Sequence, residues 1–366
     1  MTLRERVLAV LRGERPDRVP WFGDLDYWAT ALIARGERPA DFKTSADYLR
    51  WHEDLGVGFY LQGYFPFRTI YGSGERVRQD GPRRWRELPT PHGTLRDCWE
   101  YLPSSCSEGP VEHLLKSEAD LAALRYVYSR MSFEPDYDLA RRRRSEVGER
   151  GLTLCYLPKS PFMQLVALEG GIEAVTFTAA AAPDELAETL AVMKSAFDKA
   201  ARIALESPAE ALMIPENLSS EVVGPRFFEA HVRPYQEEWA GRIAAAGKTS
   251  FVHMDGTLRG LLSREASTGV RVIEAMTPAP VGDLPIGDWA ALAANPATVL
   301  WGGIPGSYFT PAVDDAAFER HLREVLAVMG AAPRYVLGVA DQVPPDGLES
   351  RVRRVAEIVE EEGRYR

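Results

Sequence analysis

The feature that most constrains this chain is a regular alternation of short apolar segments with amphipathic ones. Helical periodicity lies between the apolar segments and is clearest at residues 184–206, 226–246 and 314–330. Eight short buried strands separated by helices favour a parallel barrel over an open doubly wound sheet, which would carry fewer strands. We therefore expect an α/β fold, a TIM (β/α)8 barrel formed by residues 1–366 as one domain. The expected strands lie at residues 19–22, 58–62, 152–157, 211–214, 250–253, 272–274, 299–301 and 335–337.

Residues 67–110 interrupt this alternation. Short segments of mixed polarity are separated there by turn residues such as Gly81-Pro82 and Pro91-His92-Gly93. The pattern predicts an antiparallel β meander inserted into the N-terminal third of the barrel. Aromatic residues on such an insert would be exposed, and we expect them to support a homodimer.

Composition excludes several classes of protein. The net charge is −10 and the basic clusters are small, so we expect no nucleic-acid partner. Cys98, Cys106 and Cys155 are scattered and make no CxxC pair, which favours a reducing, cytoplasmic location. Residues 2–5 read as a helix capping box rather than a secretory signal, and no apolar run approaches the roughly 18 residues that cross a bilayer. We expect no membrane association.

Polar side chains follow several of the expected strands. In a barrel of this kind the chemistry occurs at the carboxyl ends of the strands. An imidazole together with carboxylates is a ligand set that suits zinc or iron. We therefore predict a metal site formed by His253, Asp255 and Glu274, and a catalytic set of His253, Glu216 and Asp341.

Each of these residues also has a structural alternative. His253 could be a hydrogen-bonded residue at a strand end. Glu216 could cap the following helix, and Asp255, which precedes a glycine, could belong to a turn. Asp341 could order the proline-rich turn that follows it. Glu274 has the weakest alternative, because burying it without a partner would be costly.

Aromatic residues are concentrated near the first two strands, at residues 21–28 and 59–71. They could line a pocket for an apolar or aromatic ligand, although packing in the core is the commoner use of such residues. The predicted substrate-binding residues are Trp21, Asp24, Tyr27, Tyr64 and Asn217.

With these residues identified, the sequence resembles the uroporphyrinogen decarboxylase superfamily, which includes the decarboxylase and corrinoid-linked methyltransferases. The resemblance covers nearly the whole chain and rests on several segments. They are residues 4–20, Arg-Pro-Tyr at 233–235, Ala-Gly-Lys at 246–248, His-Met-Asp-Gly at 253–256, Gly-Gly-Ile-Pro at 302–305, and 338–346.

The decarboxylase branch fits poorly. The resemblance implies an Arg-Gln-Ala-Gly-Arg run after the first strand, where this chain has Phe-Gly-Asp-Leu-Asp at 22–26. The second strand ends in Gln62-Gly63 without the family's Asp, and the last ends at Asp341 without its His. Acidic residues therefore stand where a polycarboxylate substrate would require arginines.

The methyltransferase branch implies zinc bound by a His-x-Cys motif after the fifth strand and a Cys after the eighth. His253 matches the histidine, but Asp255 and Asp341 stand in the regions of the two cysteines. A site rich in oxygen ligands binds zinc less tightly than a site built from thiolates, which disfavours activation of a thiol acceptor. The reaction still compatible with these residues is demethylation of an O-, N- or S-methylated compound.

The resulting prediction is a methyltransferase that moves a methyl group from a small methylated substrate to cobalamin, with zinc or another divalent metal activating the donor. No Asp-x-His-x-x-Gly motif occurs in the sequence, so the corrinoid is expected on a separate protein. The alternatives are a uroporphyrinogen decarboxylase-like carboxy-lyase and a non-catalytic barrel that binds a small molecule.

Overall fold

The chain folds into two compact units, each built from separated segments. The computed structural model describes residues 1–366 except 61–63, 333 and 366. The first unit contains Met1–Tyr64, Asp138–Tyr156 and Pro208–Arg366, and the second contains Phe65–Tyr137 and Leu157–Ser207. The chain thus leaves the first unit twice, and both excursions build the second unit.

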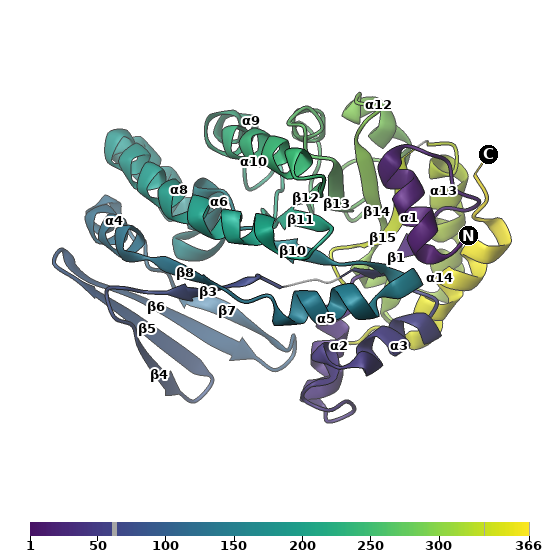
Figure 1. Cartoon of the computed structure of the whole chain (residues 1–366), viewed down its shortest axis with the longest axis horizontal. Helices are drawn as coiled ribbons and strands as arrows, with labels where there is room; N and C mark the ends of the chain where they lie inside the picture. The colour runs from purple at the N-terminus through teal and green to yellow at the C-terminus, as the bar shows by residue number, and fades with distance from the viewer. Residues whose placement is uncertain (61–63, 333, 366) are drawn as a thin grey trace. The chain divides into compact units, whose positions relative to one another are not determined.

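A seven-stranded parallel sheet forms the centre of the first unit (Figure 1). Its strand order is β1-β15-β14-β13-β12-β11-β10. Every neighbouring pair in this sheet is parallel, so the carboxyl ends of its strands meet at one edge. The strands are β1 (Trp21–Phe22), β10 (Leu154–Tyr156), β11 (Ala211–Ile214), β12 (Thr249–His253), β13 (Val272–Met276), β14 (Val299–Pro305) and β15 (Tyr335–Ala340).

A further parallel pair, β2 (Phe59–Tyr60) and β9 (Gly151–Leu152), belongs to the same unit. Gly58, which precedes β2, bridges to Phe22 of β1, and its amide donates a hydrogen bond of 2.9 Å to the carbonyl of Trp21. Strand β9 leads directly into β10. The pair therefore touches one edge strand of the seven-stranded sheet and is continuous with the other. Each of the eight segments expected as strands contains a strand, and residues 61 and 62 of the second lie outside the described residues.

Helices alternate with these strands as the periodicity predicts. Helix α1 starts at the Thr2 capping box and ends at Gly13, whose φ of 82° is the left-handed conformation that favours glycine at a helix end. The helices of the first unit are α1 (Leu3–Arg12), α2 (Asp26–Ala34), α3 (Ala46–Asp54), α5 (Asp138–Glu146), α9 (Pro225–Phe227), α10 (Arg233–Ala245), α11 (Leu262–Glu265), α12 (Trp289–Ala293), α13 (Asp315–Met329) and α14 (Glu349–Glu362).

The strands of the first unit share one apolar core. Trp301 of β14 lies at its centre, with ring centroids 5.4 Å from Phe22, 5.0 Å from Tyr60 and 5.5 Å from Phe251. These partners come from β1, β2 and β12, so one indole contacts side chains from three other strands. Three residues of α1, Val7, Val10 and Leu11, belong to the same cluster.

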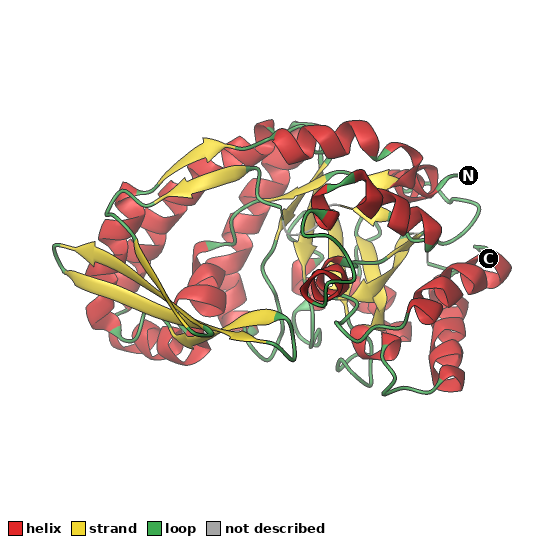
Figure 2. Cartoon of the chain, turned by 90° about the horizontal axis from the view of Figure 1, so that it is seen from below, coloured by secondary structure: helices red, strands yellow, loops and turns green. Residues whose placement is uncertain are grey.

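The second unit combines antiparallel sheets with helices (Figure 2). Strand β3 (Phe67–Ile70) does not pair with the next strand along the chain but with β8 (Ser132–Pro135). The four-stranded antiparallel sheet starts later than residue 67 and consists of β4 (Arg76–Asp80), β5 (Arg83–Thr90), β6 (Gly93–Leu102) and β7 (Ser107–Glu112). The helices are α4 (Leu121–Arg130), α6 (Pro161–Gln164), a π-helical turn η4 (Leu165–Glu169), α7 (Gly171–Ala181) and α8 (Pro183–Glu206).

The second unit contains more of the chain than the insertion predicted at residues 67–110. Helix α8, which the alternation of strands and helices assigned to the barrel, packs against α4 and β8 in the second unit. Among the described helices, none is both long and apolar enough to traverse a lipid bilayer.

Candidate active site

A hydrogen-bonded chain of three side chains, two of them buried and His253 partly buried, lies at the carboxyl edge of the parallel sheet. His253 ends β12, and its Nδ1 lies 2.8 Å from Oε2 of Glu274 on the adjacent strand β13. The other oxygen of Glu274, Oε1, accepts a hydrogen bond of 2.9 Å from the hydroxyl of Tyr60 at the end of β2. Glu274 is 1% exposed and uses both oxygens in these contacts, so it holds the imidazole in one orientation.

The second imidazole nitrogen of His253 faces two further carboxylates. Nε2 lies 3.8 Å from Oδ1 of Asp255 and 3.6 Å from Oδ1 of Asp341, which follows β15. Burial of the ring opposes its protonation. The charge and hydrogen bond of Glu274, with Asp255 and Asp341, outweigh that effect and raise the pKa of His253 to about 9.

Backbone strain accompanies this group of side chains. Three residues other than glycine have positive φ at the carboxyl ends of strands: Asn217 (57°), Ala275 (69°) and Asp341 (67°). Ala275 sits where the register between β13 and β14 shifts, which is the signature of a β-bulge. A bulge changes the direction of the neighbouring side chain, and such strain is concentrated at functional sites.

Asp24, which follows β1, adds a fourth carboxylate to this electrostatic environment. It is 4% exposed, and its Oδ1 accepts a hydrogen bond of 2.8 Å from the amide of Asp26. Burial, followed by the charges of Asp26, Glu274 and Asp341, raises the pKa of Asp24 well above its ordinary value. An environment this acidic favours a cation or a neutral ligand over an anion.

The donor set can be compared with what a metal ion requires. As the side chains lie, the described part of the chain contains no group of three His, Cys, Asp or Glu residues arranged to hold a metal ion. Donor atoms on one zinc ion lie about 3.2–3.6 Å apart, since its bonds are about 2.0–2.2 Å long. The separations of 3.6 and 3.8 Å from His253 Nε2 reach or slightly exceed that range, and both carboxylates are partly exposed.

The chemistry of these donors therefore fits a divalent cation, provided the two aspartates move slightly inward. His253, Asp255 and Asp341 would be the ligands. Glu274 was expected as a ligand, but it lies behind the imidazole on Nδ1. A carboxylate in that position orients a histidine ligand and increases its basicity.

Glu216, predicted as catalytic, interacts with another buried glutamate. It is not one of the three carboxylates within 4 Å of His253, which are Asp255, Glu274 and Asp341. It follows β11 and is fully buried. Its charge acts on Glu265 of α11, which is also fully buried and receives hydrogen bonds from the Gln236 amide at 2.9 and 3.0 Å. Burial first, and then the charge of Glu216, raises the pKa of Glu265 to about 8.

This shift predicts a pH-dependent stability. Between the ordinary pKa of 4.5 and the folded value of about 8, the folded protein keeps a proton on Glu265 that the unfolded chain has lost. The free energy of unfolding should therefore fall as pH rises through this window, by about 3–5 kcal/mol at most from this group. Glu265→Gln should remove that contribution in urea unfolding at pH 5, 6.5 and 8.5. Substituting the exposed Glu173 with Gln should leave the slope unchanged, and an unchanged slope in Glu265→Gln would contradict the assignment.

The predicted substrate-binding residues lie in different environments. Asp24 belongs to the acidic group, whereas Trp21 is buried in the core and stacks on Phe309 at 6.3 Å. Tyr27 and Tyr64 are partly buried, and Asn217 is exposed. Tyr60 was not predicted as a site residue. Its position in an expected strand and in the aromatic segment 59–71 was the available signal, but its hydrogen bond to Glu274 depends on packing between strands far apart in the sequence.

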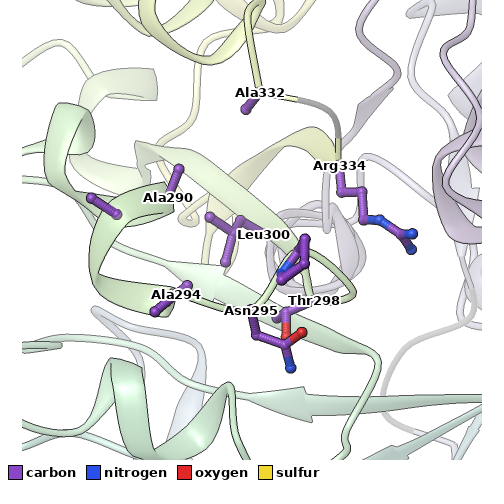
Figure 3. A pocket seen from close by; sticks show the side chains of 10 residues that line it. Ala290, Ala294, Asn295, Thr298, Leu300, Ala332 and Arg334 are labelled. Carbon is purple, nitrogen blue, oxygen red and sulfur yellow. The ribbon is translucent and has the colours of Figure 1, made fainter.

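A cavity of about 380 Å³ in the first unit lies far from this chemistry along the strands (Figure 3). Alanines make up half of its lining, together with Leu300 near the start of β14 and Arg334 just before β15. It therefore opens where these strands begin, whereas His253 and Asp341 lie where strands end.

Comparisons with known proteins agree with this architecture. A solved methyltransferase from Methanosarcina mazei has the same fold, with a TM-score of 0.64 over 99% of each chain. Its sequence is 15% identical, so the likeness concerns the fold alone. No curated protein sequence matches the chain. A family model described as "Uroporphyrinogen decarboxylase (URO-D)" matches residues 106–362, more than half of the sequence, and this chain therefore belongs to the uroporphyrinogen decarboxylase family.

Proposed function

We propose that this protein is a methyltransferase that transfers a methyl group from a small O-, N- or S-methylated compound to a corrinoid carried by a separate protein. The observation that carries the proposal is the setting of His253, with one nitrogen held by Glu274 and the other facing Asp255 and Asp341. Family membership and the fold shared with a methyltransferase support the reaction class.

We further propose that the parallel strands close into an eight-stranded barrel. The Gly58–Phe22 bridge and the continuity of β9 with β10 support closure through the β2–β9 pair. The contacts of Trp301 with rings from β1, β2 and β12 also fit a common interior. Such a barrel would gather the strand-end residues around one opening.

The residues of this chain would have three roles: binding the metal ion, orienting His253 and orienting the methyl donor. His253, Asp255 and Asp341 would hold zinc or another divalent cation, which would act as a Lewis acid toward the heteroatom of the methyl donor. Glu274 fixes the tautomer of His253 by occupying Nδ1, and the Tyr60 hydroxyl fixes Glu274 in turn. Asp24 lies close enough to influence Glu274 and Asp341 electrostatically and is a candidate to orient the donor.

The same acidity weighs against porphyrinogen decarboxylation. That substrate carries carboxylates, and Asp24, Asp255, Glu274 and Asp341 would repel them at this edge of the sheet. A small neutral or cationic methylated compound has no such penalty.

Methylation of reduced cobalamin tests the proposal directly. We expect the protein to convert cob(I)alamin to methylcobalamin, followed by absorbance, when supplied with a donor from a panel of aryl methyl ethers and methylamines. Activity should be lost in His253→Ala and retained when the exposed His92 is replaced by Ala. An absence of methyl transfer with every donor would end the proposal.

A further inference from the structure

A second cavity, of about 290 Å³, lies wholly within the second unit. Six of its thirteen lining residues are aromatic, and several of these rings pack edge to face in pairs. The ring centroids are 5.6 Å apart in Phe67–Phe133 and in Tyr128–Phe197. This volume is near the lower end of the range for small-molecule sites, so it suits a ligand of one ring. The six rings are Phe65, Phe67, Tyr71, Tyr128, Phe133 and Phe197.

Glu169, at the end of η4, brings a buried carboxylate to this cavity. Its Oε1 accepts two hydrogen bonds, from the Tyr128 hydroxyl at 2.9 Å and from Gln164 Nε2 at 3.0 Å. Its Oε2 has no hydrogen-bond donor among the described residues, although the side chain is only 7% exposed. The guanidinium of Arg86 is near, but its Nη2 is 3.9 Å from Oε2, beyond hydrogen-bond distance.

Arg86 is not free to supply the missing donor. Its guanidinium is engaged by both oxygens of Asp97, and its Nη1 donates to the Tyr71 hydroxyl at 3.0 Å. A buried acceptor without a donor costs about 1–3 kcal/mol, and more when it is charged. Oε2 of Glu169 therefore remains an acceptor that the donor of a bound molecule can occupy.

The charges around the cavity select the kind of donor. Among the charged side chains there that are largely shielded from solvent, Arg86 and Lys159 are the cations and Asp97 and Glu169 are the anions, so these four charges balance. Glu75, whose charge also acts on Tyr71, is exposed. An ammonium ligand would add an unbalanced charge at a buried site, whereas a neutral hydroxyl would not.

We propose that this cavity binds a small neutral aromatic molecule bearing one hydroxyl, a phenol. Its ring packs among the aromatic side chains, and its O–H donates to Oε2 of Glu169. Offset and edge-to-face ring contacts add to the apolar burial. The site lies within one unit, and its occupancy does not depend on the methyl-transfer chemistry proposed above.

Two probes of equal shape test the assignment. Binding of 4-fluorophenol and 4-fluorotoluene to the full-length protein is followed by ¹⁹F NMR titration. We expect 4-fluorophenol to bind at least about tenfold more tightly, because a hydrogen bond to a charged group contributes about 1.5–3 kcal/mol. Glu169→Gln should weaken 4-fluorophenol by about tenfold and change 4-fluorotoluene by less than about twofold.

Two further variants keep the test decisive if Glu169→Gln does not fold. Phe133→Ala removes part of the aromatic wall and should weaken both probes. Phe177→Ala alters a residue of the same unit that is 67% exposed and does not line the cavity, so both affinities should stay unchanged. Equal affinity of the wild type for the two probes would overturn the proposal. The proposal would also be overturned if neither probe bound at concentrations up to roughly 5 mM. In that case a water molecule would be the donor to Oε2.

Discussion

His253→Ala is expected to purify without the divalent metal that we propose for the wild-type protein, while keeping its fold. The imidazole is the one nitrogen donor in the proposed ligand set, and two partly exposed carboxylates alone hold zinc weakly. Elemental analysis by mass spectrometry should show close to one equivalent in the wild type and less than about a tenth of that in the variant. Far-UV circular dichroism should be unchanged.

Two companion variants separate metal binding from general damage. His92→Ala alters an exposed residue of the turn between β5 and β6 and should keep full metal content. Glu274→Gln should keep the metal but bind it about 10- to 100-fold more weakly, since it removes the carboxylate that orients His253. Equal metal content in His253→Ala and the wild type would rule out His253 as a ligand.

Trp301→Ala is expected to lower the free energy of unfolding by about 3–5 kcal/mol, which is typical of a large aromatic residue removed from a core. The side chain is fully buried, and its ring contacts Phe22, Tyr60 and Phe251 from three other strands. The cavity left behind would be lined by residues from opposite parts of the sheet and could not collapse easily. Urea unfolding followed by circular dichroism measures the change.

Trp301→Phe provides the matched control. It keeps an aromatic ring and removes an indole N–H that has no hydrogen-bond partner among the described residues, so it should recover much of the lost stability. Leu292→Ala, at a 42% exposed position of the same unit, should cost less than about 1 kcal/mol. If Trp301→Ala cost no more than Leu292→Ala, the shared core would not depend on this indole.

Individual residues show how far sequence reasoning reached at the candidate site. His253, Glu274 and Asp341 were expected at one edge because each follows or ends a strand, and parallel strands end together. The structure places Glu274 at 2.8 Å and Asp341 at 3.6 Å from the two nitrogens of the His253 imidazole. Glu216 follows a strand in the same way, yet it is buried with Glu265, because a residue past a strand can turn either toward the opening or toward the helices.

The sequence by itself determined where the strands and most helices lie, since segment length and hydrophobic period are local properties of the chain. It thereby also determined which acidic residues and which histidine arrive at the carboxyl edge. Only the tertiary structure decided that Glu274 lies behind His253 and that Tyr60 supports it, because a bulge at Ala275 and contacts between distant strands set those directions. It alone joined residues 65–137 to 157–207 around an aromatic cavity, since the packing of separated segments depends on contacts that no local pattern encodes.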